Sequence, residues 1–74
     1  MSEDLWASLY LQRQNKIGNR NVWLYLIVSS IGNVAVVDYE MQGMEIKRKL
    51  FEDSYDKAEA YFEYISKKII SGKL

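Results

Sequence analysis

Tryptophan, tyrosine and lysine are the residues of this chain whose types and spacing point to chemistry, and that chemistry is binding. The chain has two Trp and six Tyr. Aromatic rings provide contact area for apolar partners and stack on nucleic-acid bases, while lysines contact phosphates. The candidate binding-surface residues are Trp6, Tyr10, Trp23, Tyr25, Tyr39, Lys47 and Lys49. The candidate phosphate contacts, around the first predicted loop, are Arg13, Lys16 and Arg20.

Catalysis and metal binding are not predicted. The chain contains no His and no Cys, so it lacks the usual neutral-pH general base, a thiolate nucleophile and the usual zinc ligands. No two carboxylates stand in a pattern that indicates a paired acid/base site. We therefore expect a protein that is not an enzyme and that uses no cofactor and no metal.

Size and charge restrict the classes of partner. A chain of 74 residues allows one small domain, which we predict to span residues 1–74. Ten Lys and Arg balance ten Asp and Glu, so the overall field does not steer the chain toward nucleic acid. No apolar run has the length of a bilayer span, and the acidic residues 1–4 do not resemble a signal peptide. We expect a cytoplasmic protein that does not associate with membranes.

Four runs rich in apolar and β-branched residues predict the strands that must position these side chains. The runs cover residues 5–13, 22–30, 34–41 and 44–51. Between them we expect a polar loop over residues 15–21, a two-residue hairpin turn at Gly32-Asn33 and a second turn at Gln42-Gly43.

A helix follows the last strand. Asp53 or Ser54 can accept hydrogen bonds from its first free amides, and Gly72 is a typical residue to end it. Spacings of four, three and four residues place one apolar stripe on the helix, made of Ala58, Phe62, Ile65 and Ile69. This order predicts an α+β fold, in which an antiparallel sheet of about four strands carries the C-terminal helix on one face.

One helix covers only one face of such a sheet, so the other face must meet water or a partner. If Val22 and Leu24 point at the helix, Trp23 and Tyr25 point away from it, because successive strand residues alternate. The other residues expected on this uncovered face are Trp6, Tyr10, Lys47 and Lys49.

Two functions fit an aromatic sheet face. The first is burial against a protein partner or a second copy of the chain, as a homodimer within a larger assembly. The second is stacking of single-stranded nucleic acid, with lysines at the phosphates. We favour burial, because Trp and Tyr are enriched at protein interfaces.

The second half of the chain also carries a family pattern. Ile31-Gly32 precedes a valine-rich run, Gln42-Gly43 marks a later turn, and the closing strand and helix contain Phe51, Ser54, Ala58, Phe62, Lys68 and Gly72. These features resemble the WGR domain, a module of DNA-damage-responsive poly(ADP-ribose) polymerases and of stand-alone bacterial proteins. The Trp-Gly-Arg motif itself is absent: Tyr39-Glu40-Met41 stands near its position, and Leu74 replaces the closing aromatic residue. The resemblance implies contacts with nucleic acid and with neighbouring domains.

Overall fold

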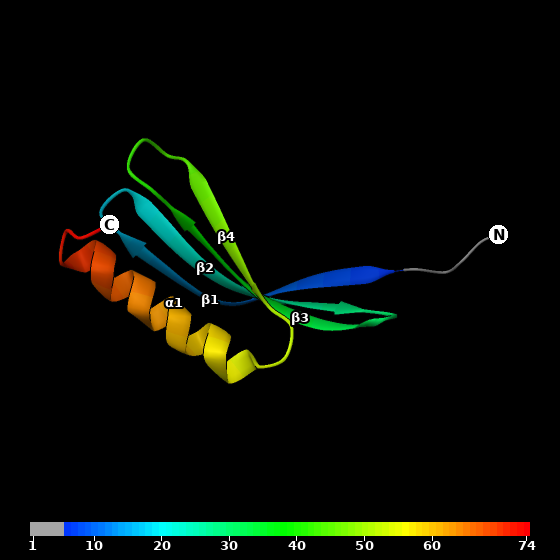
Figure 1. Ribbon diagram of the computed structural model, residues 1–74. Helices are drawn as coiled ribbons and strands as arrows, with labels where there is room; N and C mark the ends of the chain where they lie inside the picture. The colour runs from blue at the N-terminus through cyan, green and yellow to red at the C-terminus, as the bar shows by residue number, and fades with distance from the viewer. Residues whose placement is uncertain (1–5) are drawn as a thin grey trace.

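The computed structural model describes residues 6–74 as one antiparallel sheet and one helix, shown in Figure 1. The elements are β1 (Ala7–Ile17), β2 (Arg20–Ser29), β3 (Gly32–Glu40), β4 (Ile46–Phe51) and α1 (Tyr55–Ile70). The strands lie side by side in the order β1-β2-β3-β4, each antiparallel to its neighbour. The predicted α+β fold is confirmed. Residue 5, where the first strand was predicted to begin, lies outside the described residues.

A tight turn joins β1 to β2. Gly18 and Asn19 form the turn, and Ile17 lies opposite Arg20. Gly18 has φ 64°, a left-handed conformation that two-residue hairpin turns require and that glycine adopts without strain. The loop predicted over residues 15–21 is therefore wrong, because most of these residues belong to the two paired strands.

The β2–β3 hairpin is confirmed, but its turn lies two residues earlier than predicted. Ser30 and Ile31 form the turn, and Ser29 lies opposite Gly32. The Ser29 hydroxyl donates to the Gly32 carbonyl (2.6 Å) and accepts from the Ile31 N–H (3.3 Å). These bonds close the turn at Ser29, so Gly32 starts β3. The predicted turn at Gln42-Gly43 is confirmed between β3 and β4.

The helix begins and ends where its capping residues predict. The Ser54 side chain accepts a hydrogen bond from the Lys57 N–H (3.1 Å), so Ser54 rather than Asp53 is the N-cap. Gly72 follows the helix with φ 76° and donates to the Ile69 carbonyl (3.1 Å), as glycine does at many helix ends.

The core lies between α1 and one face of the sheet. Val22, Leu24 and Val37 from the strands and Phe62 from α1 have no exposed surface. All four residues of the predicted helical stripe are buried there, which confirms the stripe.

Two polar contacts from β1 hold the helix in place. The Arg13 guanidinium pairs with Glu63 of α1 (2.6 Å) and lies over the Phe62 ring, 4.7 Å from its centroid. The Asn15 amide donates to the Ser66 hydroxyl (3.0 Å). Since Ser66 is buried, this bond satisfies a polar group that would otherwise destabilise the helix–sheet contact.

The helix covers only part of the sheet. A helix of 16 residues is roughly 24 Å long, whereas the 11 residues of β1 span roughly 36 Å. Figure 1 shows the start of β1 and the β2–β3 hairpin projecting beyond the N-terminal end of α1. Among residues 6–74, no helix lies over either face of this projecting part of the sheet.

Candidate binding surface

The sheet face opposite α1 is apolar. Because Val22 and Leu24 are buried under the helix, the alternation of β2 places Trp23 and Tyr25 on the other side, as predicted. The strand register brings further apolar side chains to this side. We call this side of the sheet the open face. Its apolar residues are Leu9, Leu11, Trp23, Tyr25, Ile27, Val34, Val36, Ile46 and Leu50.

One apolar row of the open face crosses all four strands. Leu11 lies opposite Tyr25, Tyr25 opposite Val36, and Val36 opposite Leu50. Val36 has no exposed surface, although no helix covers it, because its neighbours in the row enclose it. The leucines at the two ends of the row are 52% and 53% exposed. The row therefore presents apolar surface to any partner that lies across the sheet.

An ion pair lies beside this row. Two guanidinium nitrogens of Arg48 donate to the two carboxylate oxygens of Asp38, each at 2.8 Å. Asp38 is only 6% exposed, and its hydrogen bonds and charge raise the pKa of Arg48. The two charges compensate each other, so this part of the open face can meet an apolar surface without leaving a buried charge unpaired.

Trp6 and Tyr10 lie on the other side of the sheet, so their predicted place beside Trp23 and Tyr25 is wrong. Tyr10 lies opposite Leu26, which shares the helix side with Leu24. A bulge between Leu11 and Arg13 adds one residue to β1. Each β1 residue before the bulge therefore lies on the opposite side of the sheet from the side that uninterrupted alternation would give it. Trp6 and Tyr10 are 53% and 52% exposed, because they belong to the part of β1 that projects beyond α1.

Lys47 and Lys49 also lie on the helix side, which corrects their predicted position at the border of the uncovered face. Phe51 packs against the core, and alternate residues of β4 share its side. Arg48 is therefore the basic residue of β4 that lies on the open face. Among residues 6–74, the predicted combination of Trp23 and Tyr25 with these two lysines on the uncovered face does not occur.

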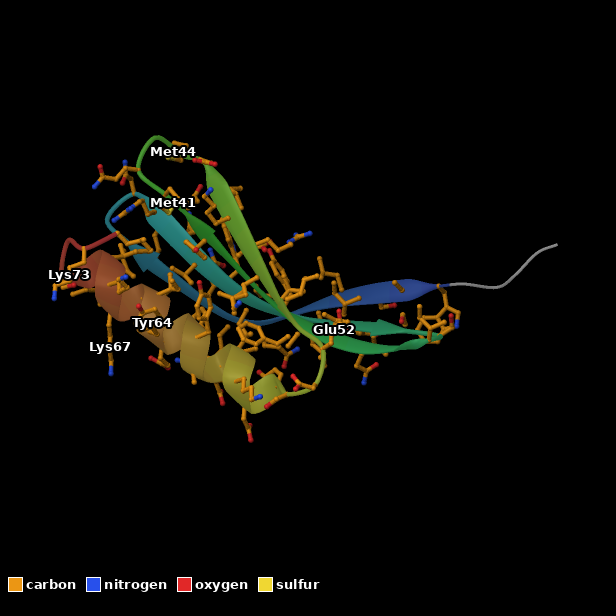
Figure 2. The ribbon with its side chains drawn as sticks, in the orientation of Figure 1. Met41, Met44, Glu52, Tyr64, Lys67 and Lys73 are labelled. Atoms are coloured by element: carbon orange, nitrogen blue, oxygen red, sulfur yellow. The ribbon has the colours of Figure 1, made fainter. Side chains whose placement is uncertain are left out.

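The three candidate phosphate contacts do not form one patch. Arg13 pairs with Glu63 on the helix side, whereas Lys16 is exposed on the opposite side. Arg20 lies at the β1–β2 turn and lines a pocket of about 310 Å³ with residues of the β3–β4 turn. Its Nη1 atom is buried without a hydrogen-bond partner among residues 6–74. Figure 2 shows Met41 and Met44, two lining residues, at that turn.

Sequence reasoning did not predict a cluster of rings and lysines between α1 and β4, here called the α1–β4 flank: Tyr39, Lys49, Phe51, Tyr61, Tyr64 and Lys68. The Tyr39 and Tyr61 hydroxyls are 3.4 Å apart. Burial raises the pKa of Tyr61 to about 12, and the hydrogen bond with Tyr39 adds to the effect. Lys49 lies over the Tyr61 ring and Lys68 over the Tyr64 ring, at 5.8 and 5.2 Å. Figure 2 places Tyr64 on the helix surface.

A signal for this flank exists in the sequence. Tyr61, Tyr64 and Lys68 are spaced three and four residues apart, so they form a second stripe along α1. Phe51 is the large apolar residue at the end of β4 and packs against the core. Lys47 and Lys49 are alternate residues of the same strand, so they lie on the same side of the sheet as Phe51.

No family model, curated protein or solved structure matches this chain. The resemblance to the WGR domain therefore stays a prediction.

Within residues 6–74, no helix combines the length and hydropathy needed to cross a bilayer. The same residues contain no group of three carboxylates placed to hold a metal ion.

Proposed function

We propose that this chain is a small non-enzymatic protein-binding module that contacts its partner through the open face, with a second copy of the chain as the first partner. The observation that supports this most directly is the row from Leu11 to Leu50, which crosses the whole sheet and ends in half-exposed leucines. Burying such surface releases about 25 cal/mol for each Å² removed from water.

The charges of the open face favour a protein over a nucleic acid. Asp38 neutralises Arg48 in the middle of the face, and the Glu40 carboxylate accepts from the Asn21 backbone and side chain at its end. The β4 lysines lie on the other side. The basic residues on the open face within residues 6–74 are Arg48, which Asp38 pairs, and Lys16 near the end of β1. A phosphate backbone would therefore meet these carboxylates with few of the cations that drive such binding, whereas an apolar protein surface would not require them.

The test is the molecular mass of the chain in solution. Leu11→Lys adds a charge to the open face, and Tyr64→Lys adds the same charge to the outer surface of α1, where the original side chain is also 52% exposed. We expect sedimentation equilibrium to give a wild-type mass that rises with concentration. Leu11→Lys should lower this self-association, and Tyr64→Lys should leave it unchanged. Equal behaviour of the two variants would contradict the proposal.

A second candidate function is binding of single-stranded nucleic acid at the α1–β4 flank. The observation that favours it is the placement of Lys49 and Lys68 over tyrosine rings at an exposed surface, since rings and cations together bind bases and phosphates. Titration of a labelled single-stranded oligonucleotide should then show binding that weakens with salt and with the double variant Lys49→Gln/Lys68→Gln. Unchanged anisotropy at low salt would remove this candidate.

A further inference from the structure

β1 is an edge strand whose two halves differ in charge. It forms one edge of the sheet, and the bulge between Leu11 and Arg13 divides it. The half before the bulge, Ala7–Leu11, has no charged residue, whereas the half after it contains Arg13 and Lys16. An uncharged edge strand with free backbone groups is a template on which another strand can pair.

The free backbone groups of this half can be assigned. The Ser30 N–H donates to the Trp6 carbonyl (3.2 Å), so the backbone of Trp6 faces β2. In an antiparallel pair, every second residue faces the neighbouring strand, which gives Ser8 and Tyr10 the same direction as Trp6. The N–H and carbonyl groups that point away from the sheet therefore belong to Ala7, Leu9 and Leu11.

Leu9 and Leu11 combine two kinds of contact. Their backbone groups point outward from the edge, and their side chains lie on the open face, 60% and 52% exposed. This half of β1 projects beyond α1, as Figure 1 shows, so the helix does not obstruct a strand placed beside it.

β4 forms the opposite edge of the sheet and, unlike the first half of β1, is protected against pairing with another strand. β4 has only six residues, and three consecutive ones, Lys47, Arg48 and Lys49, are charged. Short length and charged side chains are the common devices that prevent edge strands from pairing. The two edges therefore differ, and β1 is the one open to another strand.

We propose that residues Ala7–Leu11 pair antiparallel with the same segment of a second copy of the chain. Around a two-fold axis at Leu9, Leu9 lies opposite Leu9 of the second copy and Ala7 lies opposite its Leu11. The three outward-pointing residues of each copy then exchange backbone hydrogen bonds. The small Ala7 side chain leaves room for Leu11 on the same face.

A second copy suits this edge for two reasons of charge. The segment carries no charge, so the two-fold pairing brings no like charges opposite each other. The whole chain has ten basic and ten acidic residues and a formal net charge of zero, so no long-range repulsion separates two copies.

This pairing goes beyond the proposed function: it takes the same partner, a second copy of the chain, but joins the two copies at the β1 edge and leaves the open face uncovered. Four strands from each copy join into one sheet, with both helices on one side and both open faces on the other. The dimer thus presents the apolar row twice on one continuous surface.

Proline substitution tests the pairing, because proline has no backbone N–H. Leu9→Pro removes an outward N–H at the β1 edge and leaves the bonds between β1 and β2 intact. Leu50→Pro is the matched control, since the Glu45 carbonyl accepts from Met41, which by alternation turns the Leu50 backbone away from the sheet. Leu50 also lies on the open face and is 53% exposed.

We expect sedimentation equilibrium to give a wild-type dimer. The dissociation constant of Leu9→Pro should be roughly tenfold higher or more, because one bond is lost in each copy, and Leu50→Pro should match the wild type. Amide hydrogen exchange of the unmodified chain provides the second measurement. The Leu9 and Leu11 amides should be protected at high protein concentration and exchange fast when diluted, while the Arg48 and Leu50 amides exchange fast at both.

Two results overturn the pairing. One is a wild-type chain with the mass of a single copy at high concentration. The other is a dimer in which Leu9→Pro associates normally and the Leu9 amide is not protected. If Leu11→Lys still weakens that dimer, the open face acts without edge pairing and the proposed function remains. If Leu11→Lys has no effect either, both proposals fail.

Discussion

The two faces of the sheet are built from alternate residues of the same strands, yet they differ in what lies over them. Leu24 on the helix side has no exposed surface, whereas Leu50 on the open face is 53% exposed. Both are leucines within strands, so residue type does not explain the difference. Leu24 lies in a central strand under α1, whereas Leu50 lies in the edge strand β4 on the uncovered face, so position in the sheet and coverage by α1 together set the exposure.

The same substitution on each face should have very different effects on stability. Leu24→Ala should lower the free energy of unfolding by about 2–5 kcal/mol, because it leaves a cavity in the core. Leu50→Ala should change it by less than about 0.5 kcal/mol, as expected of a surface position. Urea denaturation followed by circular dichroism measures both. Losses of equal size would mean that the open face is as well buried as the core.

The ion pair places a buried carboxylate on the uncovered side, although its partner Arg48 is itself largely exposed. Arg48→Ala leaves the Asp38 carboxylate without its guanidinium partner at 6% exposure, which should lower the free energy of unfolding by about 1–3 kcal/mol. Lys47→Ala breaks an exposed pair with Glu45 (3.2 Å) and should change it by about 0–1 kcal/mol. Urea denaturation again measures both, and a smaller loss for Arg48→Ala than for Lys47→Ala would refute this account.

The smallest effect concerns Tyr61, at the border of the covered side. Burial and the Tyr39 hydroxyl raise the pKa of Tyr61 from 10.0 to about 12, so the unfolded chain loses this proton at lower pH than the folded chain. Stability should therefore fall as the pH rises from about 10 to about 12. Tyr61→Phe should make the fall less steep in unfolding measurements across this range, and an unchanged slope would argue against a buried hydroxyl.

The sequence predicted the elements whose signals are local. The capping pair Asp53-Ser54 predicted where α1 begins to within one residue, the stripe that includes Phe62 predicted which side it buries, and Gly72 predicted where it ends. The alternation of β2 predicted that Trp23 and Tyr25 face away from the helix. These patterns depend on residues within a few positions of one another, so they are readable without knowledge of the fold.

The positions of Tyr10 and Lys49 could not be predicted in the same way. The side chains of each strand alternate between the two sides of the sheet as predicted, but which set faces the helix depends on how the strand pairs and packs with distant residues. The bulge after Leu11 inverts β1 relative to β2, and the packing of Phe51 against the core sets β4. The bulge has no local signal, and Phe51 indicates the side of the β4 lysines only once its packing against the core is known.

The kinds of element, their order, and the presence of a sheet face that one helix leaves uncovered follow from local patterns in the chain. Which side chains occupy that face follows only from the folded arrangement, which places leucines of β1 and β4 there and the β4 lysines beside the helix. Alternation along a strand is a property of its own backbone, whereas its phase is set by hydrogen bonds and packing with residues distant in the chain.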